Sequence, residues 1–451
     1  WASACSDFLA SRLPGNLPCV GDLLALSADV IDNDRVDVFI NRVTNELSEL
    51  AGGLAIVESF SHSVVLDTGD GVVAFDASGV NTGEAVVDAI RSWTSAPVRH
   101  LVYTHGHADH VGGSAAFAEA WGAPSVVGHE NVNRRLDRYE LTNDWNIRIN
   151  TRQFGGIPRE FNLGIGGDGS GASRRFLPEG TLRTDVSFRD RHDLTVGGER
   201  IELRHARGET DDHLWAWLPD RKTVITGDFL IWNFPNAGNP QKVQRYPIEW
   251  AAALRAMIAL EPELVVPAHG LPFDGRDRIA AVIGTVATTL ERLADEVLAM
   301  MNAGATLDEI IHTVHVPEET LAKPYLRPLY DEPEFVVRNL WRQFGGWWDG
   351  AASRLKPARD AELGAVVAEL AGGTQALARR AAAEADAGNL RLACHLADLA
   401  AWAAPEDGEV HAARADIYTR RRDAERSLMA KGIYAAAARE SEEITSAAGD
   451  T

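Results

Sequence analysis

One short motif constrains this chain more than any other feature, because four side chains with metal-ligand chemistry stand within six positions. They are His105, His107, Asp109 and His110, and they directly follow residues 98–103, a short segment whose apolar end is typical of a strand. Two imidazoles two residues apart can bind one metal ion from a single loop, and the Asp–His pair can turn toward a second ion. The motif therefore predicts a metal site at the end of a strand.

Three later apolar segments also run into loops that hold a ligand-type side chain. The loops contain Glu209, Asp228 and His269, and the segments before them are residues 201–203, 223–225 and 264–266. Strands that each end in such a residue predict a sheet edge that carries a functional site.

The remaining pattern predicts a mixed α/β part followed by helices. Residues 63–67 and 72–76 flank a turn and predict a β-hairpin, and residues 84–93 have helical spacing. The Gly-rich stretch 154–180 includes a GxGxxG match at 164–169, but no strand and helix flank the match, so we expect a loop. After about residue 277 the chain is rich in alanine. Amphipathic helices are predicted at residues 358–370, 374–387, 389–403 and 409–427.

The motif at residues 105–110 is the HxHxDH signature of the metallo-β-lactamase fold, and the order of the later loops is similar to that superfamily. The resemblance implies an αββα sandwich of the α/β class. It further implies two Zn²⁺ ions per chain, with Asp109 and Asp228 taking part in catalysis and Asp76 as a supporting acceptor. One ion would be held by His105, His107 and Glu209, the other by Asp109, His110 and His269, and Asp228 would bridge them.

A glutamate at the third-ligand position, Glu209 after Gly208, is characteristic of the alkylsulfatase branch of that superfamily. Residues 102–113, 153–155, 344–350 and 387–389 also resemble segments of this branch, so that the likeness covers roughly residues 35–435. It implies a catalytic domain at residues 1–285, with an extension at 1–50, and a helical, tetratricopeptide-like dimerisation domain at residues 286–451. The branch's C-terminal sterol-carrier-like domain has no counterpart before Thr451, and we expect the chain to lack it.

The resemblance implies hydrolysis of an alkyl sulfate ester by a homodimer. Three departures keep other functions open: Asp228 replaces a usual glutamate, residues 267–270 replace a His-His-Trp-Pro type motif, and the arginine of the branch's sulfate-binding segment has no counterpart in residues 234–242. The alternatives are a hydrolase of a phosphoester, lactone or carboxylic ester, and a non-catalytic, metal-stabilised binding protein. Candidates for contact with the substrate are Asn236, Asn239, Lys242, Arg245 and His213. Four aromatic residues either form an apolar wall for an alkyl chain or pack in the core: Trp232, Phe234, Tyr246 and Trp250.

The composition limits the classes of molecule that this chain is expected to bind. The formal net charge of −21 argues against nucleic acid or an anionic membrane, and no segment approaches the roughly 18 apolar residues of a membrane span. We therefore expect a small-molecule substrate. Three cysteines (Cys5, Cys19 and Cys394) are too few for a disulfide scaffold, although Cys5 and Cys19 could pair. We expect a cytoplasmic protein, or a periplasmic or secreted one if a leader preceded Trp1.

Overall fold

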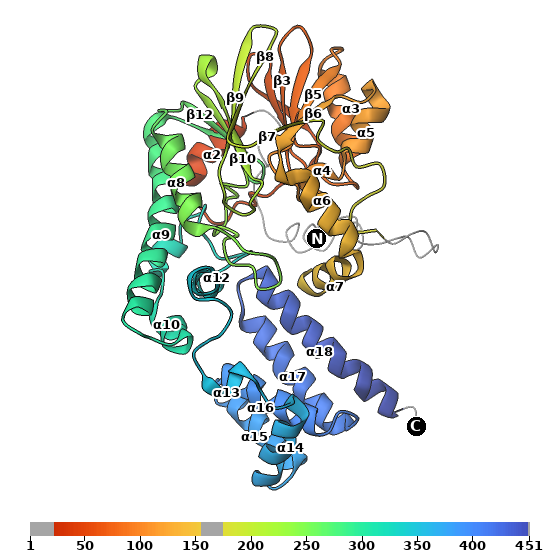
Figure 1. The fold of residues 1–451 in the computed structure, drawn as a ribbon, viewed down its shortest axis with the longest axis vertical. Coiled ribbons are helices and arrows are strands. Elements are labelled where there is room, and N and C mark those ends of the chain that lie inside the picture. The colour runs from red at the N-terminus through yellow and green to blue at the C-terminus, as the bar shows by residue number, and fades with distance from the viewer. Residues whose placement is uncertain (1–21, 155–174, 450–451) are drawn as a thin grey trace. The chain divides into compact units, whose positions relative to one another are not determined.

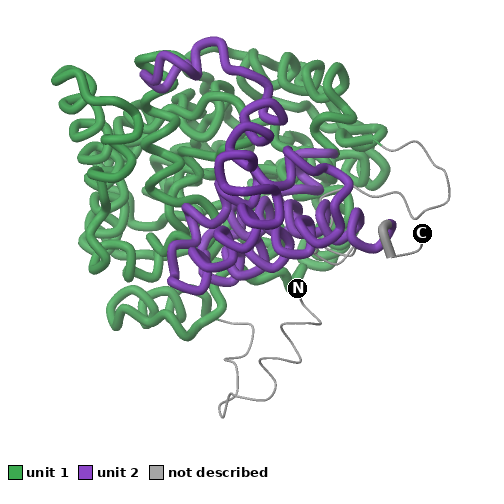
Figure 2. The backbone as a smooth tube through the Cα atoms, turned by 90° about the horizontal axis from the view of Figure 1, so that it is seen from below, with its two compact units in different colours: residues 1–147, 157–346 green, residues 148–156, 347–451 purple. Residues whose placement is uncertain are grey.

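The structure is a computed structural model that describes residues 22–154 and 175–449. Cys5, Cys19 and the GxGxxG match at 164–169 lie outside the described residues. The chain divides into two compact units, residues 1–147 with 157–346 and residues 148–156 with 347–451 (Figure 2). Within the described residues, no helix is both long and apolar enough to cross a bilayer.

The first unit contains two β-sheets (Figure 1). The seven strands of the first sheet lie side by side in chain order: β1 (Leu47–Ala51), β2 (Leu54–Val57), β3 (Ser63–Asp67), β4 (Val72–Phe75), β5 (Val98–Val102), β6 (Ser125–His129) and β7 (Val186–Phe188). The second sheet has the order β13 (Phe273–Asp274), β12 (Leu264–Pro267), β11 (Thr223–Gly227), β10 (Leu214–Leu218), β9 (Glu199–His205) and β8 (Arg191–Val196). Strands β3 and β4 pair antiparallel, which confirms the predicted hairpin.

The strands β2, β3 and β4 of the first sheet are buried on both faces, which explains why they are almost continuously apolar. Leu54 and Ile56 of β2 belong to the core that the two sheets share, whereas Ala55 and Val57 pack in a second core with helix α3 (Gly83–Trp93). Alternate residues of a strand point to opposite faces, so one short strand contributes to both cores.

Helices surround both sheets and connect them. Besides α3, the first unit contains α2 (Leu23–Asp32), α4 (Ala108–Val111), α5 (Ser114–Trp121), α6 (Asn131–Leu141), the start of α7 (Asn143–Gln153), η2 (Pro219–Arg221), α8 (Pro247–Ile258), α9 (Arg276–Asn302), α10 (Leu307–Thr313), α11 (Glu318–Leu321) and α12 (Pro333–Gly345). Helix α8 packs along α9, and α9 contacts β12 and β13 of the second sheet.

The predicted domain boundary at residues 285 and 286 falls inside α9, and the two compact units divide at residues 346 and 347 instead. Ile279, Ile283, Leu290 and Val297 of α9 are all buried in the shared core of the first unit. A cut at residue 285 would leave half of this apolar stripe without its partners, so the helix belongs with the sheets.

The second unit is helical, as predicted for this part of the chain. It contains the remainder of α7, from Arg148 on, and the helices α13 (Ala352–Leu355), α14 (Asp360–Leu370), α15 (Thr374–Asp386), α16 (Leu390–Ala403), α17 (Gly408–Ala424) and α18 (Leu428–Gly449). Alanines fill its small cores, including Ala381 and Ala393, because short side chains let neighbouring helices approach closely.

Candidate metal centre

The predicted ligands come from both sheets and meet at one end of the sandwich. His105, His107, Asp109 and His110 follow β5 of the first sheet. Glu209 lies between β9 and β10, Asp228 follows β11, and His269 follows β12, all in the second sheet. The structure places these seven side chains in two groups. Within each group, the ligand atoms all lie within 4.8 Å of one another. One group is His105, His107, Glu209 and Asp228, and the other is Asp109, His110 and His269.

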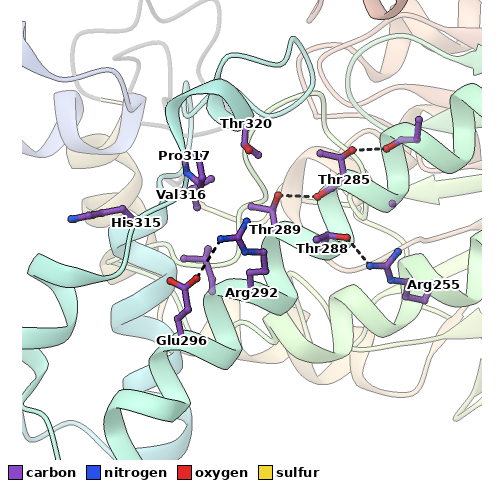
Figure 3. A pocket seen from close by; sticks show the side chains of 13 residues that line it. Arg255, Thr285, Thr288, Thr289, Arg292, Glu296, His315, Val316, Pro317 and Thr320 are labelled. Carbon is purple, nitrogen blue, oxygen red and sulfur yellow. Dashed lines mark hydrogen bonds and ion pairs between the residues drawn. The ribbon is translucent and has the colours of Figure 1, made fainter.

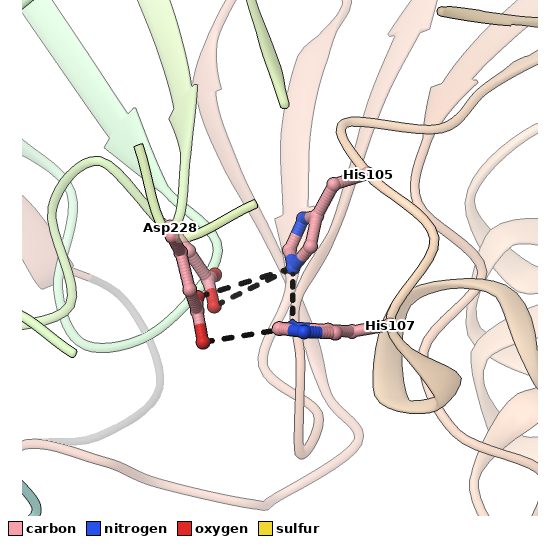
Figure 4. Close-up of side chains that lie close together, drawn as sticks. His105, His107 and Asp228 are labelled. Carbon is pink, nitrogen blue, oxygen red and sulfur yellow. Dashed lines mark hydrogen bonds and ion pairs between the residues drawn. The ribbon is translucent and has the colours of Figure 1, made fainter. Parts of the chain in front are cut away.

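Asp228 stands between the two groups. Its Oδ2 lies 3.9 Å from Nε2 of His105, which is itself 2.8 Å from Nδ1 of His107 (Figure 4). Its Oδ1 lies 3.4 Å from Nε2 of His110 and 3.6 Å from Nε2 of His269. The two oxygens of one carboxylate therefore face different ligand groups, which is the arrangement needed to bridge two cations.

The buried polar atoms of this centre fit a metal ion. Nε2 of His110 and Oδ1 of Asp228 are both buried without a hydrogen-bond partner among the described residues. Leaving such atoms unsatisfied is costly, and a bound cation would satisfy both. The donor set of imidazoles and carboxylates is also that of Zn²⁺ and related ions.

The charge states of His105, His107 and Asp228 suit a bound cation as well. Burial, with further positive charge nearby, lowers the pKa of His105 and His107 well below the ordinary value, so both are neutral donors. For His110, burial lowers the pKa but the surrounding carboxylates, Asp228 first, raise it well above the ordinary value, so this ring must release its proton before Nε2 can bind an ion. Burial raises the pKa of Asp228, yet His110 and His269 outweigh burial, and the carboxylate stays ionised.

Asp76 orients the motif from behind, as its place at the end of the hairpin predicts. Its Oδ1 accepts a hydrogen bond from the Thr104 backbone N–H at 2.8 Å, and its Oδ2 accepts one from the Thr104 hydroxyl at 2.7 Å. Oδ2 also lies 2.8 Å from Nδ1 of His110, which directs Nε2 of that ring toward the candidate site.

Asp212 and Arg135 were missed by the sequence reasoning, although they hold the loop that carries the motif. Asp212 is fully buried; its Oδ2 accepts from the backbone N–H of Gly106 at 2.9 Å, and its Oδ1 accepts from Nε of Arg135 at 2.9 Å. Arg135 also donates to Asp211. Because these partners are more than 70 positions apart, no local pattern marks them.

Two of the predicted substrate contacts instead face Glu209. Asn236 and Arg245 are buried, and Nδ2 of Asn236 donates to Oε1 of Glu209. Nη1 of Arg245 donates to the Glu209 backbone carbonyl at 2.5 Å, and its Nη2 lies 3.5 Å from Oε1. Asn239 is placed next to them, with its Nδ2 3.4 Å from Oδ1 of Asn236. The backbone N–H groups of Gly238 and Asn239 donate to the buried Asp331, which the sequence pattern did not single out.

His213 and Lys242 have different surroundings. His213 is fully buried behind Asp228: its Nε2 accepts from the Asp228 backbone N–H at 3.1 Å, and its ring stacks on Phe229 at 4.1 Å. Lys242 is half-buried, with its Nζ 5.9 Å from the centre of the Phe176 ring. Burial, and then the charge of Arg245, lowers the pKa of Lys242 to about 7.

Three of the four aromatic residues that the sequence suggested for an apolar wall are part of the core. Trp232, Phe234 and Trp250 are buried, and the two indole N–H groups donate to backbone carbonyls of Leu271 and Phe229. They therefore pack the interior and leave no open apolar wall at those three positions.

Gly270, directly after the candidate ligand His269, has no room for a side chain. Its φ is +91°, and a Cβ there would lie 2.4 Å from the Trp232 indole. We expect Gly270→Ala to lower the free energy of unfolding by about 2–4 kcal/mol, combining the unfavourable φ with overpacking. Gly304→Ala is the matched control, because Gly304 has a φ of +86° and an open site. It should cost only about 1 kcal/mol. Chemical denaturation measures both; equal losses would contradict the steric explanation.

A separate cavity of about 320 Å³ lies along α9, lined among others by Arg255, Thr288, Arg292 and His315 (Figure 3). Its arginines are already paired, Arg255 with Glu291 and Arg292 with Glu296. None of the predicted site residues lines it.

Comparisons with known proteins agree with this geometry. Residues 56–269 match the family described as Metallo-beta-lactamase superfamily, and residues 306–443 match the family described as Alkyl sulfatase dimerisation. A linear primary-alkylsulfatase of Pseudomonas sp. (strain ATCC 19151) is 27% identical over 337 residues, which are 70% of this chain and 60% of that protein. An (R)-specific secondary-alkylsulfatase of Pseudomonas sp. is 24% identical over 383 residues, 80% of this chain and 56% of that protein.

A solved structure shares the fold. It is that of the stereoselective inverting sec-alkylsulfatase Pisa1 from Pseudomonas sp., with a TM-score of 0.76 at 22% identity, covering 88% of this chain and 65% of that one. The chain spans less than two thirds of the length of the two curated relatives.

Proposed function

Because this chain belongs to the metallo-β-lactamase superfamily and carries an alkyl sulfatase dimerisation domain, we propose that it hydrolyses alkyl sulfate esters at a pair of Zn²⁺ ions. The observation that carries the proposal is the placement of Asp228, whose two oxygens face two different ligand groups. The alkylsulfatase names of both curated relatives favour a sulfate ester over other esters.

The candidate ligands differ in exposure: some side chains lie deep in the centre, and others are partly open to solvent. His105, His110 and Glu209 are at most 3% exposed and would hold the ions from behind. His107, Asp109 and His269 have side chains 17–20% exposed, so the ester approaches over them. When bound, the ions would supply positive charge that polarises the ester and makes water more acidic. Around them, Asp228 bridges the two groups, His213 fixes the Asp228 backbone, and Lys242 attracts the sulfate.

A substrate panel tests this proposal. The zinc-loaded protein is assayed with dodecyl sulfate, a phosphodiester and a lactone, each with and without a chelator. We expect sulfate release from dodecyl sulfate that stops when the metal is removed and returns with added Zn²⁺. Absence of sulfate release would overturn the proposal, and turnover of the phosphodiester or the lactone alone would assign the site to that ester class.

Replacing Lys242 with methionine should raise KM for an alkyl sulfate about tenfold while kcat changes little, since a charged hydrogen bond contributes about 1.5–3 kcal/mol. With a pKa of about 7, the ammonium is charged below that pH and loses its charge as the pH rises. KM of the unmodified protein should therefore increase above pH 7, and the variant should lack this increase. Lys222→Met, at an exposed lysine paired with Glu263, is the control. A pH-independent KM in both proteins would contradict a role for Lys242.

We further propose a homodimer that forms through an exposed face of α14. Leu363, Val366 and Leu370 are 51%, 55% and 83% exposed, and their spacing of three and four residues places them on one side of the helix. The helix lies within the segment that matches the dimerisation family.

The double substitution Leu363→Glu with Leu370→Glu should convert the dimer to a monomer, because charges on an apolar interface lose their water without gaining partners. Sedimentation equilibrium measures the mass. Leu141→Glu, at a residue 84% exposed on α6, should leave the dimer intact. A folded double variant that remains dimeric would locate the interface elsewhere.

A further inference from the structure

The carboxylate of Glu209 contacts other protein groups in addition to the candidate metal ligands. Its carboxylate is 3% exposed. Oε1 accepts from Asn236 and lies 3.5 Å from Nη2 of Arg245, whereas Oε2 lies 4.0 Å from Nε2 of His105. Oε1 also lies 3.6 Å from Nδ1 of His107, so the oxygen that Asn236 and Arg245 contact is one that faces a candidate ligand, and these contacts fix the rotation of the carboxylate.

Arg245 is itself locked in place. It is 1% exposed, and its backbone carbonyl accepts from Nδ2 of Asn339 at 2.9 Å. The next residue, Tyr246, donates its N–H to the carbonyl of Gly208 at 2.9 Å, so residues 245–246 are joined to residues 208–209 by backbone as well as side chain. The backbone bonds fix the point from which the side chain extends, and the guanidinium cannot turn away without losing its contacts with Glu209.

The charges explain why such a clamp is needed. Glu209 shares its ligand group with a second carboxylate, Asp228. Two buried carboxylates repel each other, and burial of either is costly without a counter-charge. Arg245 is the fixed cation that touches Glu209 directly, and it is present whether or not an ion is bound.

We infer that Arg245, together with Asn236, is a positioning clamp that orients the Glu209 carboxylate and offsets its charge, and thereby sets the metal affinity of the group formed by His105, His107, Glu209 and Asp228. The inference rests on the proposed role of Glu209 as a metal ligand. It gives Arg245 a different task from the sulfate contact expected from its sequence position: both of its terminal nitrogens face Glu209.

Zinc affinity, and not activity, tests the clamp. In a His269→Ala background, which weakens the other ligand group, Zn²⁺ affinity is measured by competition with a chromogenic chelator. Arg245→Met should weaken binding about tenfold or more, the usual cost of losing a partner of a metal ligand. Arg245→Lys keeps the positive charge but not the two donor groups of the planar guanidinium, and its Zn²⁺ affinity should lie between those of the parent and Arg245→Met. Arg221→Met is the control, because Arg221 grips Glu199 and a backbone carbonyl away from the centre.

A double-mutant cycle separates this inference from the proposed function. In a Glu209→Gln background, Arg245→Met should have at most about a twofold effect, because the partner through which it acts has lost its charge. Equal losses in both backgrounds, or no loss in the first, would overturn the clamp. If Arg245→Met does not fold, Asn236→Ala carries the test, with an expected loss of about threefold or more; unchanged affinity would again overturn it. Failure to hydrolyse dodecyl sulfate, with these affinity changes intact, would refute only the proposed substrate.

Discussion

Replacement of Asp228 by asparagine is expected to lower kcat/KM for ester hydrolysis about a thousandfold, which corresponds to about 4 kcal/mol of lost transition-state stabilisation. The amide has nearly the same size, but it carries no charge and offers only one acceptor oxygen. One of the two ligand groups would then face an N–H₂ donor where Oδ1 or Oδ2 now stands. We also expect the purified variant to contain less than half of the metal found in the unmodified protein, measured by elemental analysis.

Asp220→Asn provides the matched control for this substitution. Asp220 also follows a strand of the second sheet, but its side chain is 52% exposed and pairs with Arg200 at the surface. Its replacement should change neither metal content nor rate. Full metal content with a rate within tenfold of the unmodified protein would show that Asp228 is not the bridge.

The second large effect concerns stability. Asp212→Ala should lower the free energy of unfolding by about 3–5 kcal/mol, because it leaves the buried guanidinium of Arg135 without its buried counter-charge and the Gly106 N–H without an acceptor. Asp211→Ala removes the other carboxylate from the same arginine, but its side chain is 45% exposed, and the loss should stay below about 1 kcal/mol. Urea unfolding of the metal-free proteins measures both. Similar losses would contradict the importance of burial.

The same pair predicts a dependence on acidity. Burial raises the pKa of Asp212, but the charge and hydrogen bond of Arg135 lower the pKa by more than burial raises it. The pKa in the folded state therefore lies below the ordinary value. The stabilisation is therefore complete above the unfolded pKa of about 3.9 and is lost as the pH falls through the folded pKa. The difference in stability between the unmodified protein and Asp212→Ala should shrink on acidification below about pH 4.

The strands and ligand loops could be predicted because their signals are local. A strand with a buried end gives a short apolar run, and a polar loop directly after it places ligands such as His105 and His269 at a sheet edge. The partners of those ligands could not be predicted in the same way. Arg245 stands 36 positions from Glu209, and only the fold shows that this cation faces a buried carboxylate. Helix α9 is a second example. Its helical pattern is evident in the sequence, but only its buried contacts with the core between the two sheets show that it belongs to the first unit.

The origin of each ligand group has a consequence for folding. Both groups combine side chains from loops after β5 with side chains from the second sheet. An ion can bind such a set only when the sandwich is assembled, and therefore free metal acts as a ligand of the native state alone. By mass action, a concentration one hundred times the dissociation constant adds about 2.7 kcal/mol to the free energy of unfolding. Scarcity of the metal would therefore lower turnover and stability together, and would increase the small fraction of unfolded chains that proteases can cleave.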